Sequence, residues 1–275
     1  MANAVFSALI RQLRQPRDAA REIQLPPERN LIFDVLAEGR RKKTIYLTGD
    51  AELGHLRNLI ASHKAQEIPL SLTACLGKAL ACALQEQPEM QSYLRGSKKR
   101  IVFNSIDLAC MIERELPDGC RQPLHYIIRD CQNKSLPIIQ QELQQARIAP
   151  VGAGGPLSPL ENWFLHWPGW LRWFVWLWIR RDPYTSKQLM GTVGLTSIGM
   201  FGSGAMLILP ISPLTLTLSI GGVSKKLIIK DGQLDECESI QFALAADHDV
   251  IDGAPLMRFA SRLKEIIAHG HPNLA

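Results

Sequence analysis

Three residues near the carboxyl end of the sequence have types and a spacing that suit proton transfer. His248, Asp252 and Gly253 form an H-x-x-x-D-G array in ALAADHDVIDGAPLMRF, directly after an apolar strand pattern that ends at Asp247. A histidine at a strand end can reach a substrate, and imidazole is the side chain whose unperturbed pKa suits proton removal near neutral pH. The carboxylate can orient a nearby loop or arginine, and the glycine permits a tight turn into a helix. His248 is therefore a candidate general base.

A structural interpretation of this array stays open from the residues alone. His248 can be a core histidine with satisfied hydrogen bonds, and Asp252 can cap a helix that begins near Ala254. The surrounding sequence favours catalysis. The segment DHDVIDGAPLMRFASRLKEII resembles the signature of dihydrolipoamide acyltransferase catalytic domains, in which a D-H-R-x-x-D-G-A stretch carries the catalytic histidine. Chloramphenicol acetyltransferases share its H-x-x-x-D-G core.

A second similarity lies upstream of the array. GTVGLTSIGMFG is similar to the family's glycine, Thr-Ile-Ser, Leu-Gly segment, and Thr196 takes the place of its hydroxyl residue. A hydroxyl there can donate a hydrogen bond to the oxyanion of a tetrahedral intermediate, although Thr196 and Ser197 can also be plain strand residues. Weaker similarity to the family extends over two further segments, LTACLGKALACALQEQPEMQSYL and HYIIRDCQNKSLPIIQQEL. The resemblance thus covers about residues 31–270, and four matches in order are more specific than H-x-x-x-D-G alone.

The resemblance implies a fold and a mechanism. The expected fold is α/β, a chloramphenicol acetyltransferase-like two-layer sandwich with a mixed sheet, assembled as a trimer with active sites between subunits. His248 of one chain would meet Thr196 of its neighbour. His248 would remove a thiol proton, the thiolate would attack a carbonyl, and Thr196 would stabilise the oxyanion. The implied substrate is a coenzyme A thioester or an external lipoyl carrier, and Asp252 would pair with Arg40 or Arg41.

Three departures from the family pattern stand out. Because about 30 residues precede the expected core, we expect neither a lipoyl domain nor a covalently bound lipoyl group on this chain. Asp249 stands where the family usually has an arginine beside the histidine, which reverses the local charge. Finally, about 35 residues, at about 155–190, intervene where the relatives have a short connection.

The intervening segment contains all six tryptophans, between Trp163 and Trp178 in ENWFLHWPGWLRWFVWLWIRRDP. A spanning helix needs about 20 mostly apolar residues, and His166, Pro168 and Arg172 interrupt this run. Tryptophan flanked by arginine suits a helix in a membrane interface or one covering an acyl channel. A buried helical hairpin at a subunit contact is an equally open interpretation. The first interpretation would give the protein a peripheral membrane contact.

The elements that must position these residues follow from hydrophobic spacing. Residues 1–30 are polar and arginine-rich and predict an N-terminal arm, and residues 31–270 predict the catalytic domain. An extended segment over 31–47 and a helix beginning near Asp50 come first. Periodicity then predicts a helix over 70–84, strands within 101–114 and 124–128, and a helix through Gln140 and Gln145. Further strands are expected in TVGLTSIGMF, TLTLSIGGV, KLIIKDGQL and SIQFALAAD, and a closing helix over Gly253 to His269.

Composition narrows the function classes. The formal net charge is +5, and apart from residues 40–43 the basic residues are spread along the chain, so no nucleic-acid partner is expected. The six cysteines show no CxxC spacing and no Cys/His cluster, so no metal site is expected and a reducing cytoplasm fits them best. If the tryptophan-rich segment is interfacial, the inner face of a membrane is the expected location.

The leading hypothesis is accordingly an acyltransferase with the catalytic residues His248, Asp252 and Thr196. A non-catalytic trimeric scaffold, which uses the tryptophan-rich segment to bind a membrane or a partner, is the alternative from another class. Hydrolysis of a thioester by the same histidine is a third hypothesis.

Overall fold

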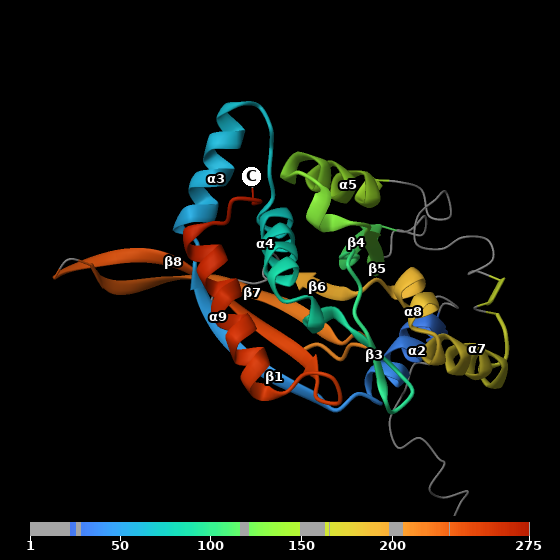
Figure 1. Cartoon of the computed structure of the whole chain (residues 1–275). Helices are drawn as coiled ribbons and strands as arrows, with labels where there is room; N and C mark the ends of the chain where they lie inside the picture. Colours follow the sequence, from blue (N-terminus) through green and yellow to red (C-terminus); the bar gives the residue numbers. More distant parts are fainter. Residues whose placement is uncertain are drawn as a thin grey trace, which may run out of the picture.

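A six-stranded mixed sheet organises the chain (Figure 1). The computed structural model describes residues 23–25, 29–115, 121–148, 163–164, 166–197, 206–230 and 232–274. The sheet has the order β1-β8-β7-β6-β4-β5, and β6 runs parallel to both of its neighbours while the other pairs are antiparallel. Its strands are β1 (Thr44–Glu52), β4 (Leu108–Glu115), β5 (Arg121–Ile128), β6 (Val193–Ser197), β7 (Leu216–Lys230) and β8 (Gln233–Asp247).

One layer of helices covers one face of the sheet, so the predicted α/β two-layer sandwich with a mixed sheet is confirmed (Figure 1). Helix α9 packs on β1, α5 packs on β4 and β5, and α4 lies between α9 and α5. The helices are α2 (Arg29–Gly39), α3 (Gly54–Ala65), α4 (Leu72–Glu86), α5 (Leu136–Ile148), α7 (Gly169–Arg181), α8 (Pro183–Met190) and α9 (Gly253–His269), with 3-10 turns at Pro88–Gln91 and Cys131–Asn133. A small hairpin, β2 (Tyr93–Arg95) and β3 (Lys99–Ile101), stands apart from the main sheet.

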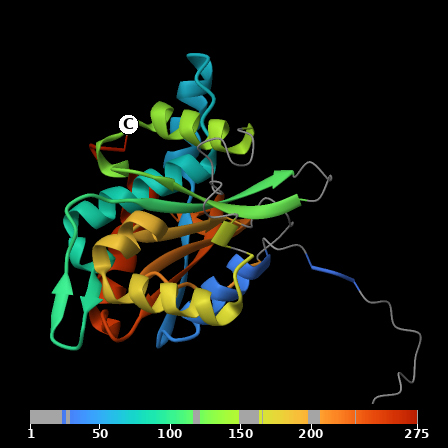
Figure 2. The ribbon, with the colours of Figure 1, turned by 90° about the vertical axis from the view of Figure 1, so that its right-hand side faces the viewer.

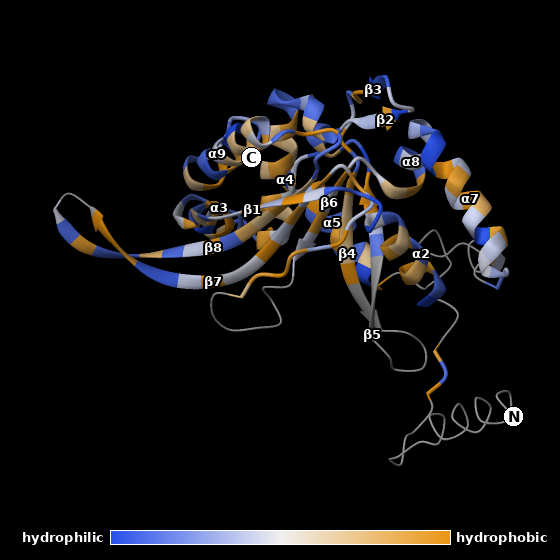
Figure 3. Cartoon of the chain, turned by 90° about the horizontal axis from the view of Figure 1, so that it is seen from below, coloured by the Kyte–Doolittle hydropathy of each residue, from blue (hydrophilic) through white to orange (hydrophobic). Residues whose placement is uncertain are grey.

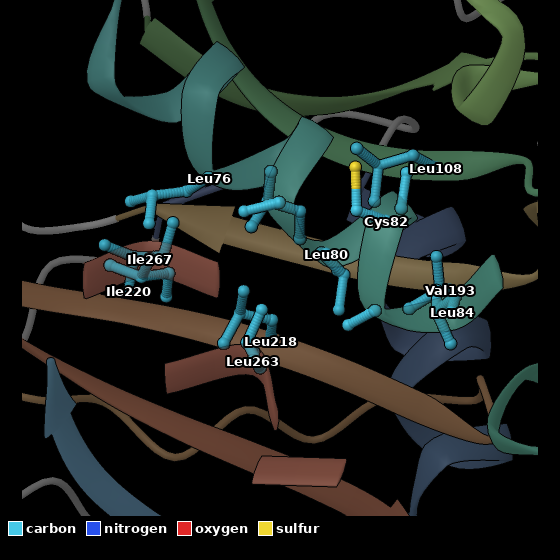
Figure 4. Close-up of a cluster of buried hydrophobic side chains, with 14 of the residues drawn as sticks. Leu76, Leu80, Cys82, Leu84, Leu108, Val193, Leu218, Ile220, Leu263 and Ile267 are labelled. Carbon is cyan, nitrogen blue, oxygen red and sulfur yellow. The ribbon is translucent and has the colours of Figure 1, made fainter. Parts of the chain in front are cut away.

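The hydrophobic core lies between this helical layer and the sheet (Figure 4). Every residue of α4 from Ala74 to Leu84 is buried, including Lys78, whose ammonium donates to the Gln132 and Lys134 carbonyl oxygens at 2.8 Å and 2.7 Å. The Ser71 hydroxyl caps α4 by accepting from the Ala74 N–H at 3.2 Å. A Cβ added at Gly77 would lie 2.9 Å from a Leu108 methyl group, so glycine lets α4 approach β4 closely.

Helix α9 reaches the same core through a regular stripe. Its buried residues fall at spacings of three and four, the pattern of one helix face: Leu256, Phe259, Ala260, Leu263, Ile266 and Ile267. The predicted bounds of this helix, Gly253 to His269, are those observed, and the predicted helices over 70–84 and through Gln140 and Gln145 are also confirmed.

Three predictions about elements need correction. Residues 29–39 form helix α2 instead of an extended segment, because Asp34 and Glu38 pair with arginines of α7, far away in the sequence. The strand β1 continues to Glu52, so the next helix begins later than predicted. The strands expected in TLTLSIGGV, KLIIKDGQL and SIQFALAAD form only two long strands, β7 and β8. The first two of them are continuous because β7 passes Gly221 with a β-bulge and does not end there. A Cβ at Gly221 would lie 2.4 Å from the Met206 carbonyl oxygen.

The structure describes part of the predicted insertion and only a small part of the predicted N-terminal arm. Helices α7 and α8 lie within the predicted insertion, and α7 packs beside α2 (Figure 2). No helix in the described ranges has the length and apolar character needed to cross a membrane. Most of the predicted arm, residues 1–30, and most of residues 149–165 lie outside the described residues.

Candidate active site

The H-x-x-x-D-G array forms the turn that joins β8 to α9. Strand β8 ends at Asp247. The backbone carbonyl oxygen of Asp247 accepts hydrogen bonds from the Val250 and Ile251 N–H groups at 2.9 Å each. The backbone N–H of His248 donates to the Lys43 carbonyl oxygen at 2.9 Å, which ties the turn to the start of β1. The backbone of His248 is therefore fixed by its neighbours on both strands.

The imidazole of His248 is available for chemistry. Its side chain is 47% exposed, so it is not a core histidine. Its Nδ1 lies 3.6 Å from Oδ1 of Asp252. Asp252 occupies the N-cap position of α9, but its side chain makes no capping hydrogen bond. The carboxylate thus faces the imidazole and leaves Nε2 for a substrate.

Asp247 is the anchor of the turn, and the sequence analysis did not identify it. Its side chain is buried, accepts a hydrogen bond from the Lys42 ammonium at 2.8 Å, and accepts another from the Asp249 N–H at 3.2 Å. An acidic residue directly before the histidine was the available signal. Its partner could not be read from the sequence because Lys42 lies more than 200 residues away.

Asp249, which replaces the arginine expected from the family pattern, is neutralised locally. Its carboxylate accepts from the Lys43 ammonium at 2.8 Å, and both side chains are exposed. This hydrogen bond and the charge of Asp249 raise the pKa of Lys43. The reversed charge beside His248 is thus paired within the chain.

Thr196 does not meet His248 within one chain. It lies on β6 opposite Ser219 of β7, and Ser219 lies opposite Ala243 of β8. Thr196 is therefore level with Ala243, two strands away and well before the end of β8. At about 3.4 Å per residue and about 4.8 Å between strands, Thr196 and His248 are on the order of 15–20 Å apart. The structure brings Asp252 to His248 and leaves Thr196 apart from both.

Within the described part of a single chain, Asp252 forms no ion pair with Arg40 or Arg41. Arg41 pairs with Glu38 at 3.3 Å, and the Asp252 carboxylate lies 3.6 Å from the His248 imidazole. Both arginines follow α2 and precede β1, where they rim the end of the sheet.

A second polar cluster, also missed by the sequence analysis, fixes α8 against the sheet. The buried carboxylate of Asp107 accepts from Lys187 of α8 at 2.9 Å, from Arg129 at 2.8 Å and from the Asp130 N–H at 3.1 Å. Burial alone would raise the pKa of Asp107, but the hydrogen bonds from these cations hold it below its ordinary value of 3.8.

The cysteines do not contribute a reactive centre or a metal site in the part of the chain described. Cys75, Cys82, Cys110 and Cys131 are buried free thiols, and Cys237 is half-buried. Burial raises the pKa of the Cys75 thiol to about 11, which keeps it protonated and unreactive near neutral pH. Among the described residues, no group of three or more His, Cys, Asp or Glu side chains could hold a metal ion.

Comparison with known families identifies which part of the chain is shared. Residues 17–149 and 183–274 match the model described as the 2-oxoacid dehydrogenases acyltransferase (catalytic domain). The match leaves out residues 150–182, which include all six tryptophans and the whole of α7. A search of curated proteins gives no match.

Several solved structures share the fold over nearly their whole length. The cubic core of a pyruvate dehydrogenase multienzyme complex is similar with a TM-score of 0.67 and 19% identity, covering 95% of this chain and 100% of that one. Dihydrolipoamide acetyltransferase of Azotobacter vinelandii gives 0.69 and 20%, with coverages of 94% and 96%. A probable dihydrolipoamide acetyltransferase of Listeria monocytogenes gives 0.67 and 20%, with 94% and 99%.

Proposed function

The chain belongs to the 2-oxoacid dehydrogenase acyltransferase family, of which it is a catalytic domain, and from this premise we propose how it transfers an acyl group. The acyl group moves between a thioester, of the coenzyme A or lipoyl type, and an acceptor. His248 is the general base, Asp252 orients it, and Thr196 is the oxyanion donor across a subunit interface. The observation that carries the proposal is the exposed imidazole of His248, fixed by its backbone and faced at Nδ1 by Asp252.

The proposed steps conserve atoms and charge. Nε2 of His248 takes the proton of an incoming thiol, and the thiolate attacks the carbonyl carbon of the acyl donor. The Thr196 hydroxyl donates a hydrogen bond to the oxyanion that forms. When the tetrahedral intermediate collapses, the acyl group stays on the attacking sulfur, and the leaving group takes the proton from the imidazolium.

The assignment of Thr196 and Asp252 has support from a relative. In the Azotobacter vinelandii enzyme, a serine, a histidine and an asparagine have been investigated for their role in the catalytic mechanism. That serine precedes its histidine by the same number of residues as Thr196 precedes His248. The asparagine follows its histidine at the spacing at which Asp252 follows His248.

A homotrimer resolves the separation of Thr196 from His248. Because the two residues are too far apart to act together within one chain, a subunit contact must unite them if both act on one substrate. One relative forms a cubic core, and cubic symmetry contains threefold axes around which trimers are arranged. The β7–β8 hairpin projects from the body and exposes apolar residues that suit such a contact, namely Leu227, Ile229 and Leu234 (Figure 1).

The proposed partners are small-molecule acyl donors and acceptors, with coenzyme A as the thiol carrier. We assign no covalently bound lipoyl group to the matched catalytic domain. The buried free thiols suit a reducing compartment such as the cytoplasm. A scaffold without catalysis has no use for an exposed histidine held by a carboxylate, so the observed geometry favours transfer.

Helix α7 supports a peripheral membrane contact through Trp163 to Trp178. In this helix the charged Arg172 faces inward together with Trp176, whereas the other aromatic residues of the helix face outward. These are Trp170, Trp173, Phe174 and Trp178, which are between 45% and 63% exposed. Figure 3 shows α7 at the edge of the molecule, with hydrophobic segments along the helix. Exposed tryptophans beside Arg180 and Arg181 are typical of helices that lie in a membrane interface.

The experiment that tests the proposed transfer is a thiol-release assay of the purified protein with a panel of acyl coenzyme A thioesters, with and without acceptors. We expect acceptor-dependent release, lowered about 100-fold or more by His248→Ala. His269→Ala, an exposed histidine at the other end of α9, is the matched control and should leave turnover unchanged.

The same assay can contradict the proposal. Release that does not need an acceptor would assign hydrolysis instead of transfer. Release that persists in His248→Ala would remove the general base from His248. No release from any donor, followed by no transfer to an external lipoyl carrier, would leave the scaffold hypothesis.

A further inference from the structure

A pocket of about 340 Å³ lies where the tryptophan-rich helix meets the turn that carries His248. Its walls come from α7, α8, the end of α2 and the β2–β3 hairpin, and they include Asp247 and Asp249 on either side of His248. Figure 2 shows α7, α8 and α2 gathered at this end of the sheet. The α7 wall falls in the residues that the family model leaves unmatched, so family membership does not predict this pocket.

The pocket wall carries more positive charge than its own carboxylates neutralise. Arg41 and Arg180 share the single carboxylate of Glu38, at 3.3 Å and 3.2 Å. Lys42 pairs with Asp247. Arg181 also lines the pocket, and it makes no ion pair with any residue in the described part of the chain. The wall therefore has guanidinium groups available for an added anion.

Trp176 adds an unused hydrogen-bond donor to the same wall. Its side chain is only 8% exposed, and its indole Nε1 is buried without a hydrogen-bond partner. A buried donor left unsatisfied is destabilising, and buried indole N–H groups usually have a hydrogen-bond partner. A ligand oxygen would satisfy this group, and the nearby side chains of Ile179 and Met190 would pack against an apolar part of the ligand.

We propose that this pocket binds the anionic end of a small-molecule substrate, a carboxylate or a phosphate group, and holds it beside the turn that carries His248. The role of the ligand as a substrate rests on the proposed acyl transfer, whereas the binding itself does not. Either the acyl acceptor or the acyl carrier can supply the anion.

The test is calorimetric titration of the intact protein with two probes, inorganic phosphate and succinate. We expect at least one probe to bind. Arg181→Gln and Trp176→Phe should each weaken this binding about tenfold, because each removes one hydrogen bond to the ligand. Two matched controls should bind as the wild type does: Arg147→Gln, at an exposed arginine of α5, and Trp178→Phe, on the outward face of α7.

The outcomes separate this inference from the proposed function. If neither probe binds at millimolar concentration, or if Arg181→Gln binds with wild-type affinity, the inference is overturned. Because Arg181 is exposed, this variant should fold even if Trp176→Phe does not. His248→Ala should bind the probes normally, so a protein that binds but does not turn over contradicts only the acyl transfer. Displacement of phosphate by coenzyme A would assign the anion to the carrier, and succinate binding that survives saturating coenzyme A would assign it to the acceptor.

Discussion

His248 is positioned by residues on either side of it in the chain and by the start of β1. The buried carboxylate of Asp247 joins the Lys42 ammonium to the backbone of the turn, and the His248 N–H is bonded to Lys43. Both contacts fix the main chain and leave the imidazole exposed. The orientation of the proposed general base thus depends on an ion pair between the end of one strand and the start of its neighbour.

We predict that Asp247→Asn lowers both stability and turnover. The amide keeps the size of the side chain but loses the charge that pairs with Lys42, which should lower the free energy of unfolding by about 1–3 kcal/mol. Displacement of the turn should lower kcat by roughly tenfold. Urea unfolding and the thiol-release assay measure the two effects. Asp235→Asn, at an exposed residue of β8, is the control. An unchanged kcat would show that this ion pair does not position His248.

Helix α8 is attached to the sheet by a charged contact in addition to the apolar packing of Met190. Lys187 reaches the buried Asp107 carboxylate, which Arg129 also contacts. Asp107 lies next to β4 and Arg129 next to β5, so one carboxylate joins three elements. Such a contact fixes the orientation of a helix more strictly than apolar packing does. It therefore positions α8, which forms one wall of the pocket that we propose binds an anion.

The depressed pKa of Asp107 predicts how stability changes in acid. A carboxyl group whose folded pKa lies below its ordinary value of 3.8 adds stability that is present above that value. The contribution is lost as the pH falls through the lower folded pKa. Asp107→Asn should be less stable than the wild type at pH 7 and should lose less stability on acidification below 3.8. Urea unfolding over a pH series, with Asp235→Asn beside it, measures both. Parallel curves for wild type and Asp107→Asn would contradict the prediction.

Helix α7 buries an ion pair and exposes all of its aromatic residues except Trp176. Arg172 bonds to Asp34 of α2 at 2.8 Å, and both side chains are largely buried. Two of the three arginines of α7, Arg172 and Arg180, thus attach the helix to α2. Apart from Arg180 and Arg181, the exposed side chains of α7 are aromatic.

We predict that this outward face binds membranes. Replacing Trp170, Trp173 and Trp178 together with serine should abolish sedimentation with liposomes, because it removes the exposed indoles and spares the buried Trp176. The control replaces Met206, Ile208 and Leu209 with serine, since these apolar residues are 48–59% exposed and lie outside α7. It should sediment as the wild type does. If the tryptophan variant still sediments, or if it changes only assembly, the face is a contact between proteins.

At the scale of the whole molecule, the proposed site is not assembled within one chain. The register of the sheet separates Thr196 from His248, and no rearrangement of side chains can close a gap on the order of 15–20 Å. If both residues act on one substrate, as we propose, a second chain must supply one of them. The exposed apolar residues of the β7–β8 hairpin indicate where such a chain can pack.

We predict that two inactive variants restore activity when mixed. Thr196→Val chains keep His248, and His248→Ala chains keep Thr196, so a contact between them in the right order rebuilds an intact site. Random assembly after joint refolding should give roughly a quarter of the wild-type sites. Each variant refolded alone should stay at least about 100-fold below the wild type. If the mixture remains inactive, the site does not combine these two residues across subunits.

The sequence by itself determined the elements whose stability depends on local pattern. The apolar stripe of α9 predicted its bounds, the apolar run of α4 predicted a buried helix, and the pattern around His248 predicted a strand end followed by a helix from Gly253. These features are readable because helices and strands place side chains at fixed periods. The ordered motifs also predicted the family and the α/β fold.

Only the tertiary structure decided the rest, because the partners involved are distant in the sequence. Helix α2 was mistaken for an extended segment because Asp34 and Glu38 find their arginines on α7. The pairs Lys42–Asp247 and Lys187–Asp107 join segments that no local pattern relates, and so do the walls of the anion pocket. The inward and outward faces of α7 were likewise fixed by its neighbour. Periodicity shows that a helix has faces, but a charge is buried only where the fold brings its counter-charge, and this depends on long-range packing.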